Sequence, residues 1–104
     1  MTTDIRIRSR RRDGGIDVTV LLRHPMESGL RKDAAGRPLP AHFITDATVS
    51  VDDRVVLEAT LGIAVSRDPL LTFRLELDLP ADARIAVRWR DNLGTEQQAE
   101  TRIG

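Results

Sequence analysis

The side chains that could perform chemistry in this chain are few, and they gather in one stretch. The two histidines, His24 and His42, bracket a segment that also holds Glu27 and Ser28. The sequence contains no cysteine, so disulfides, thiolate nucleophiles and cysteine-ligated metals are excluded for this chain. Covalent catalysis would therefore have to use histidine, serine or carboxylate groups.

A serine hydrolase is the first alternative, because Ser28 lies close in sequence to His24 and acidic residues are plentiful. The Gly-x-Ser-x-Gly elbow that exposes a nucleophilic serine is missing. Ser28 directly precedes Gly29, a pairing that is typical of a turn. We therefore favour a turn serine over a nucleophile.

A metal site is the second alternative. His24, Glu27 and His42 would suit zinc or another borderline ion if the segment between them folded back on itself. Their spacing matches no compact metal motif, and lone histidines in loops commonly serve as hydrogen-bonding groups. We expect no metal, no cofactor and no catalytic residue, and hence a protein that is not an enzyme.

Charge and composition narrow the function further. The chain has 16 basic and 16 acidic residues, and this balance argues against a nucleic-acid or anionic-membrane binder. The run Arg10-Arg11-Arg12 is most simply the charged end of an edge strand, where it would discourage edge-to-edge pairing. The glycines form no phosphate-cradling pattern, because no glycine-rich turn opens a helix.

The elements that must position these residues are strands. Apolar and polar residues alternate with a period of two in seven separate sets, which lie at 5–7, 16–22, 47–51, 55–61, 73–79, 85–89 and 99–103. Turn signals separate the sets, at 13–15, 52–53, 80–82 and 91–94. The pattern predicts an all-β, immunoglobulin-like β-sandwich of about seven antiparallel strands, forming a single domain over residues 1–104.

Two side-chain expectations follow from this alternation. Trp89 lies on the apolar side of its strand and is expected to anchor the core. The stripe Arg84, Arg88 and Arg90 reads as a solvated sheet face, with Glu76 and Asp78 as possible cross-strand partners.

Two segments break the alternation. Residues 24–42 form a long connection with three of the five prolines, which predicts an ordered loop and makes it our first choice for a binding surface. Residues 62–70 contain apolar residues without alternation. They could cross between the two sheets or offer an apolar surface to a partner.

The loop also carries a family signature, which is the run His24-Pro25-Met26-Glu27-Ser28-Gly29-Leu30-Arg31-Lys32-Asp33, then Gly36, then Pro40-Ala41-His42-Phe43-Ile44. With Val65-Ser66-Arg67-Asp68-Pro69, Leu71 and Phe73, and with Val87-x-Trp89-x-Asp91-Asn92-x-Gly94, it closely resembles the SoxZ family. The resemblance covers nearly the whole chain. Small departures, such as Asp68 where Asn is more usual and Ser28 where Thr is common, do not weaken it.

The resemblance implies a fold and a function. SoxZ-like chains adopt an immunoglobulin-like sandwich and pair with SoxY, whose cysteine on a flexible arm carries sulfur intermediates between enzymes of thiosulfate oxidation. It implies a non-catalytic scaffold in a periplasmic heterodimer, with transient docking of other Sox enzymes. The opening Met1-Thr2-Thr3-Asp4 lacks the apolar core of a secretory signal, so we expect export together with SoxY.

Candidate interface residues follow from the family reading. They are His24, Pro25, Met26, Glu27, Leu30, Arg31, Leu39, Pro40, His42 and Phe43. For Met26, Leu39 and Phe43 a second role is equally open, which is to seal the domain's own core. The rival function is a free-standing immunoglobulin-like structural or adhesion module.

Overall fold

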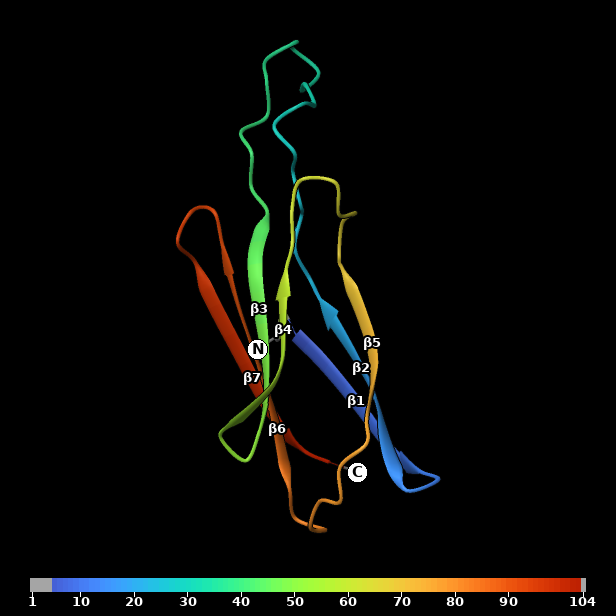
Figure 1. Cartoon of the computed structure of the whole chain (residues 1–104). Coiled ribbons are helices and arrows are strands. Elements are labelled where there is room, and N and C mark those ends of the chain that lie inside the picture. The colour runs from blue at the N-terminus through green and yellow to red at the C-terminus, as the bar shows by residue number, and fades with distance from the viewer. Residues whose placement is uncertain (1–4, 104) are drawn as a thin grey trace.

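The protein is an all-β sandwich, described here from a computed structural model of residues 5–103 (Figure 1). Seven antiparallel strands form two sheets, one in the order β1-β2-β5 and one in the order β4-β3-β6-β7. The strands are β1 (Ile5–Arg12), β2 (Gly15–Leu22), β3 (Ile44–Val51), β4 (Arg54–Thr60), β5 (Leu70–Leu75), β6 (Arg84–Asp91) and β7 (Glu96–Arg102). The immunoglobulin-like sandwich predicted from the alternation is confirmed.

Alternation explains why the central strands bury one face. Every second residue of β2, β3 and β6 is buried, including Val18, Val49 and Val87. These side chains meet between the two sheets because successive residues of a strand point to opposite faces. Trp89 is 4% exposed and packs in this core, as its position on β6 predicted.

The tight turns lie where the sequence signals placed them. Asp13 and Gly14 join β1 to β2 with positive φ angles of 50° and 79°. Asp52 and Asp53 join β3 to β4 with φ angles of 47° and 67°. Two consecutive left-handed residues give the turn the twist that antiparallel hairpins require.

Two strands differ from the sequence prediction. The fifth strand runs from Leu70 to Leu75, not over 73–79, because its partner β2 ends its pairing where Ile16 lies opposite Leu75. In β4, a bulge opposite Val49 and Ser50 shifts the register. A bulge inserts an extra residue and reverses which face the following side chains occupy.

The bulge moves one predicted core residue outward. Val55 pairs with Ser50, lies on the outer face and is 52% exposed. Leu57 and Ala59 stay on the inner side, opposite Val49 and Ala47. The prediction of a single apolar face over 55–61 was therefore wrong at Val55.

The arginines of β6 pair differently from the expectation. Arg84 forms an ion pair with Glu100, and Arg90 lies 3.4 Å from Glu96, so both use acids of the neighbouring strand β7. Glu76 instead pairs with Arg74 at 2.7 Å. Pairing with Glu76 and Asp78 was wrong because β5 and β6 belong to different sheets.

The run Arg10-Arg11-Arg12 does lie at the end of an edge strand, since β1 is the outermost strand of its sheet. Arg12 pairs with Asp17 at 2.9 Å. Arg11 donates hydrogen bonds to the carbonyl oxygens of Leu79 and Pro80. These contacts fit the structural role that the sequence favoured for this run.

The sandwich is closed on one side and open on the other. On the closed side, β1 and β7 lie against each other. On the other side the edge strands are β4 and β5, and the segment between them crosses from one sheet to the other. The apolar residues along this side are only half-buried, and we call them the apolar edge: Leu57, Ala59, Leu61, Val65, Leu71 and Phe73.

A long extension, residues 23–43, projects beyond the sandwich between β2 and β3 (Figure 1). The molecule is 54 Å long and only 24 by 23 Å across. Its radius of gyration of 15.7 Å exceeds the roughly 13 Å expected for a compact domain of this length. The extension therefore does not fold back over the core. No helix within residues 5–103 is long and apolar enough to cross a membrane.

Candidate functional site

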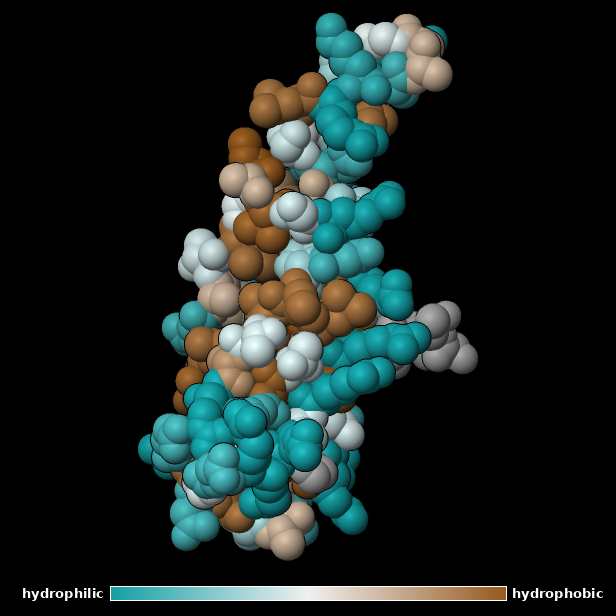
Figure 2. All heavy atoms as spheres, turned by 90° about the vertical axis from the view of Figure 1, so that its right-hand side faces the viewer, coloured by the Kyte–Doolittle hydropathy of each residue, from teal (hydrophilic) through white to brown (hydrophobic). Residues whose placement is uncertain are grey.

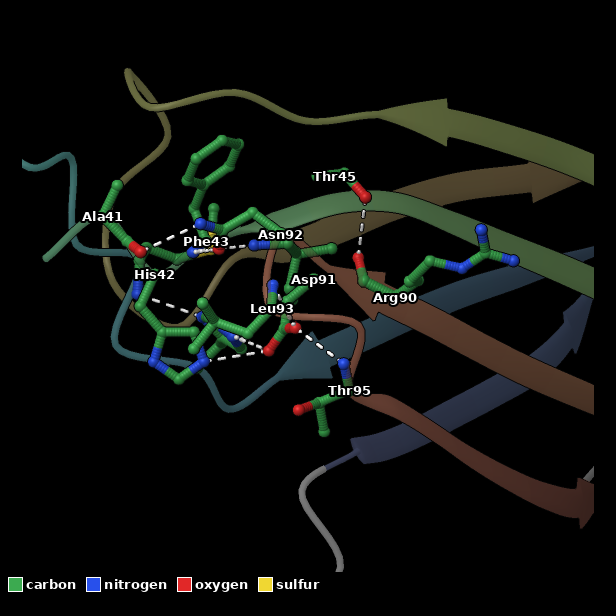
Figure 3. Close-up of polar contacts among 12 residues, drawn as sticks. Ala41, His42, Phe43, Thr45, Arg90, Asp91, Asn92, Leu93 and Thr95 are labelled. Atoms are coloured by element: carbon green, nitrogen blue, oxygen red, sulfur yellow. Dashed lines mark hydrogen bonds and ion pairs between the residues drawn. The ribbon is translucent and has the colours of Figure 1, made fainter.

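A buried carboxylate, Asp91, lies at the base of the extension and joins its two arms (Figure 3). His24 Nε2 lies 3.2 Å from Asp91 Oδ2, and His42 Nε2 lies 2.9 Å from the same oxygen. The other oxygen, Oδ1, accepts hydrogen bonds from the backbone N–H groups of Leu93 and Thr95 at 3.0 and 2.9 Å. We call His24, His42 and Asp91 the histidine–aspartate cluster.

Strand ends bring this cluster together. His24 follows the last residues of β2, His42 precedes β3, and Asp91 is the last residue of β6. Because β3 pairs antiparallel with β6, the start of β3 lies beside the end of β6, with Ile44 opposite Asp91. The cluster therefore connects the two sheets as well as the two arms.

The hydrogen bonds fix the proton positions. Met26 N–H donates to His24 Nδ1 at 3.1 Å, so this nitrogen carries no proton. In neutral His24 the proton is then on Nε2, from which it is donated to Asp91. His42 likewise places Nε2 against Asp91.

The same donors and acceptors decide whether this cluster could bind a metal ion. The ligand atoms of His24, His42 and Asp91 lie within 4.8 Å of one another, a separation compatible with a shared ion. A metal on His24 Nε2 would have to replace the proton that Asp91 accepts, because Nδ1 is already occupied by Met26. The donor set fits a hydrogen-bonded structural cluster better than a metal centre.

The ionisation of Asp91 follows from its contacts. Burial acts to raise the pKa of Asp91, but hydrogen bonds from His24, Thr95, His42 and Leu93 outweigh it. The pKa of Asp91 therefore lies below its ordinary value, and the carboxylate stays charged where it lies.

Further contacts hold the returning arm of the extension. Asn92 Oδ1 accepts from Phe43 N–H at 2.8 Å, and Asn92 Nδ2 donates to the Ala41 carbonyl oxygen at 2.9 Å (Figure 3). Met26 has a positive φ of 49°, and its sulfur accepts from Ile44 N–H at 3.3 Å. These bonds satisfy backbone groups where the extension leaves the sandwich.

The extension itself is a hydrogen-bonded pair of arms. Glu27 and His42 exchange backbone hydrogen bonds of 2.7 and 2.8 Å. Farther out, Leu39 N–H donates to the Arg31 carbonyl oxygen at 2.8 Å. Asp33 Oδ1 caps the tip by accepting from two backbone N–H groups at 2.9 Å. The sequence predicted an ordered loop from its prolines, and this series of hydrogen bonds supports that prediction.

The proposed ligand Glu27 is not part of the cluster. Its Oε2 lies 3.2 Å from Arg31 Nε, close enough for an ion pair but without hydrogen-bond alignment. Asp91 occupies the position that the metal hypothesis gave to Glu27. Ser28 Oγ accepts from Leu30 N–H at 3.1 Å, which fits the turn role favoured for this serine.

Exposure divides the ten interface candidates. His24 and Met26 are buried in the chain's own structure, at 4% and 7% exposed, so their side chains support the extension from within. Glu27, Leu39, His42 and Phe43 are half-buried, and Pro25, Leu30, Arg31 and Pro40 are exposed. Contact of these residues with a partner stays a prediction.

Sequence reasoning missed the roles of Asp91 and Asn92 in this site. Asp91 ends β6 and Asn92 begins the turn after it, and in the sequence both read as turn residues and as part of a family motif, with no role in the site. Their side chains instead bind the extension, across 49 residues of chain. The signal that could have pointed to them is their place in the family motif Val87-x-Trp89-x-Asp91-Asn92-x-Gly94.

One known protein family matches nearly the whole chain. Residues 5–102 match the family model described as "Sulphur oxidation protein SoxZ". The chain belongs to the SoxZ family. Membership in the SoxZ family gives the chain a role in the Sox sulfur oxidation system. A comparison with curated proteins finds no match.

Proposed function

We propose that this chain is the non-catalytic scaffold subunit of a SoxYZ heterodimer. It holds SoxY, whose cysteine would carry covalently attached sulfur intermediates between enzymes of the thiosulfate-oxidising Sox system. The observation that carries the proposal is the apolar edge, an incompletely buried side of the core in a chain of the SoxZ family. The chain has no thiol of its own, so a sulfur carrier built on it requires one from a partner.

The apolar edge has the properties of a surface that a partner covers. Leu57, Leu71 and Phe73 are only half-buried, and Ile63 on the crossing segment is 48% exposed. Figure 2 shows apolar side chains gathered in a stripe along the molecule, with hydrophilic side chains beside it. Contiguous apolar surface on a small soluble domain marks an interaction site, and obligate interfaces are the more apolar ones.

The backbone favours the same side. Within residues 5–103, β4 pairs only with β3 and β5 pairs only with β2, so each has one edge of backbone N–H and C=O groups outside the sheet ladders. An exposed strand edge is a template for a further strand. A partner strand would satisfy these groups while its side chains cover the apolar edge.

The extension is the second proposed surface, for transient contact with other Sox enzymes. Leu30 is 81% exposed, and the Arg31 side chain is 70% exposed. A rigid arm that presents an exposed leucine and an arginine suits brief docking better than permanent burial. Arg31→Ala tests this role with an intact SoxYZ complex, because the substitution spares the histidine–aspartate cluster. Unchanged thiosulfate turnover with every Sox enzyme would contradict it.

We further propose a periplasmic location, reached by export in complex with SoxY. The opening Met1–Asp4 lies outside the described residues. Cell fractionation with and without SoxY tests the proposal. Periplasmic chain in cells that lack SoxY would contradict co-export.

Capture of SoxY tests the heterodimer directly. The tagged chain is co-expressed with SoxY, and SoxY is expected to copurify in a one-to-one ratio. Ile63→Asp places a charge on the crossing segment, between Leu61 and Val65 of the apolar edge, and should reduce capture at least tenfold, since burying an unpaired charge is costly. The matched control is Leu93→Asp, which changes an apolar residue that is 63% exposed in the β6–β7 turn. This turn lies toward the β7 edge of the four-stranded sheet, whereas the apolar edge lies along β4.

Two outcomes would count against the heterodimer. If the chain is a stable monomer that never captures SoxY, the rival free-standing immunoglobulin-like module is favoured. If Leu93→Asp reduces capture as strongly as Ile63→Asp, the apolar edge is not the surface that binds SoxY.

A further inference from the structure

A cleft of about 480 Å³ opens beside the histidine–aspartate cluster, where the extension meets the sandwich. Both sheets contribute to it. Its polar lining includes Arg23 after β2, Arg67 on the crossing segment, and Thr95 and Gln97 near the start of β7. Trp89 and His42 lie in the same lining.

The two arginines of this cleft are unused cations. Arg23 and Arg67 are exposed, and neither forms an ion pair or a side-chain hydrogen bond with the described residues. Arg12, Arg74 and Arg84 are each paired with an acid, whereas exposed arginines such as Arg54 and Arg88 form no such pair with the described residues. What distinguishes Arg23 and Arg67 is therefore their position at the cleft. Free guanidinium groups at a cleft favour anions, because their planar donors match oxyanion geometry.

A buried hydrogen-bond donor also favours a ligand that offers acceptors. The Trp89 indole N–H is buried and has no acceptor within residues 5–103. Indole nitrogen can only donate, and buried donors are nearly always satisfied, so an orphan one calls for an acceptor. Trp89 lines the cleft, so this unsatisfied N–H belongs to a residue of the cleft wall.

The acidic groups of the cleft are largely engaged by the chain's own donors. Both oxygens of Asp91 accept hydrogen bonds, and the side chain is 1% exposed. Asp68 Oδ1 accepts from His24 N–H at 2.9 Å. Asp68 Oδ2 is the acceptor left over, and Asp68 and the buried Asp91 carry the two negative charges that oppose an anion in the cleft.

We propose that this cleft binds a tetrahedral oxyanion, with Arg23 and Arg67 as the charged donors. Such a ligand offers acceptors only, in keeping with a lining whose free groups are mainly donors. The anion could be free in solution or carried on a partner's side chain, and the chemistry of recognition is the same. Choosing sulfur oxyanions as the probes rests on the proposed function.

The single tryptophan makes the test direct. An ¹⁵N-labelled chain gives one indole N–H resonance, from Trp89, which reports on the cleft. Sodium thiosulfate and sodium sulfate are titrated against sodium chloride at equal ionic strength. Thiosulfate or sulfate is expected to move this resonance in a saturable way, and chloride is not.

Substitutions locate the site. Arg67→Gln and Arg23→Gln should each weaken binding on the order of tenfold, as expected for the loss of a charged hydrogen bond. Asp68→Asn should tighten binding, because it removes one of the two opposing charges and keeps an oxygen for His24 N–H. The matched control is Arg54→Gln, an exposed arginine at the β3–β4 turn, at the opposite end of the sandwich (Figure 1).

Three results would overturn the proposal. They are a chloride response equal to that of thiosulfate, no saturable response to either sulfur oxyanion, and an effect of Arg54→Gln equal to that of Arg67→Gln. None of them bears on SoxY capture by the apolar edge, which is measured separately. Failure of the oxyanion site and failure of the proposed heterodimer are therefore distinguishable.

A peptide separates the two sources of the anion. A short glycine peptide with one central cysteine stands for a flexible cysteine-bearing arm. This peptide with an S-sulfonate on its cysteine is compared with the same peptide bearing a free thiol. Tighter binding of the sulfonated peptide than of free thiosulfate assigns the cleft to a carried anion, and the reverse order assigns it to a free one. Binding of the free-thiol peptide as tight as that of the sulfonated one would contradict recognition of the oxyanion.

Discussion

At the scale of residues, Asp91 decides how the extension is attached. It is 3% exposed and accepts hydrogen bonds from two histidine side chains and two backbone N–H groups. A buried carboxylate is tolerated only when its oxygens are fully bonded. Asp91 therefore acts as a structural anchor between His24, at the end of one sheet, and His42, at the start of the other.

Asp91→Asn is expected to lower the free energy of unfolding by about 3 kcal/mol, because it removes a buried charge that several donors face. Urea denaturation measures the loss. Asp78→Asn is the control, since Asp78 is exposed and should change stability by less than about 0.5 kcal/mol. Equal losses for the two variants would show that the cluster contributes nothing special.

The lowered pKa of Asp91 predicts a dependence of stability on pH. In the folded chain this pKa lies below the ordinary value of 3.8, so the unfolded chain takes up the proton first. The stability that Asp91 contributes is complete above about pH 5 and is lost as the pH falls through 3.8 toward the folded-state pKa.

Urea midpoints measured between pH 5 and pH 3 check this dependence. The wild type should lose more stability over this range than Asp91→Asn loses. Asp17, whose pKa is lowered chiefly by a hydrogen bond from Arg74, contributes equally to both proteins and cancels in the comparison. Parallel curves for the two proteins would rule out a titrating Asp91.

At the scale of elements, the extension is held at its base and free at its tip. Base residues bond to the β6–β7 turn, whereas residues 31–38 are all exposed. Met26, with its left-handed backbone, turns the outgoing arm away from β2. The strain of such a conformation persists only where surrounding contacts determine it, as they do here through His24 and Ile44.

Asn92→Ala is expected to loosen the extension without unfolding the sandwich. It removes the two side-chain hydrogen bonds between Asn92 and the returning arm, each worth about 1 kcal/mol, and keeps the backbone bond from Asn92 N–H to the Phe43 carbonyl oxygen. Hydrogen exchange at the Glu27 and His42 amides should accelerate by roughly fivefold or more, while amides of β2 keep their protection. Gln98→Ala, at an exposed position of β7, is the control and should change neither set. Equal acceleration throughout the chain would mean that the extension is not an independent unit.

At the scale of the whole molecule, the sandwich has one side on which its apolar residues are incompletely buried. Its closed side joins β1 and β7, whereas the apolar edge between β4 and β5 is only half-buried. A small domain depends strongly on what little apolar surface it buries. Covering the apolar edge should therefore add directly to stability.

SoxY is expected to stabilise the chain by mass action. At a free SoxY concentration of 100 times the Kd, the free energy of unfolding should rise by about 2.7 kcal/mol. Thermal unfolding at increasing SoxY concentration measures this gain. Ile63→Ser should reduce the gain, and Leu93→Ser should leave it unchanged. A melting temperature independent of SoxY would contradict the predicted pairing.

The sequence by itself determined the architecture, because period-two alternation dictates which face of each strand is buried. The alternation at 16–22 and 85–89 assigned β2 and β6 their buried faces, including Trp89. Turn residues such as Asp13 and Gly14 separated the strands. The long loop motif gave the family, which the match over residues 5–102 established.

Only the tertiary structure decided which distant side chains meet. The bulge that turns Val55 outward depends on how β4 pairs with β3, and local alternation does not contain that pairing. His24, His42 and Asp91 converge because antiparallel pairing of β3 and β6 places separate strand ends together. The metal alternative, which the sequence did not favour, grouped the histidines with nearby Glu27, since a sequence displays only proximity along the chain. The carboxylate that they bind belongs to Asp91, which lies 67 residues from His24 along the chain. Only the folded structure brings these two residues into contact.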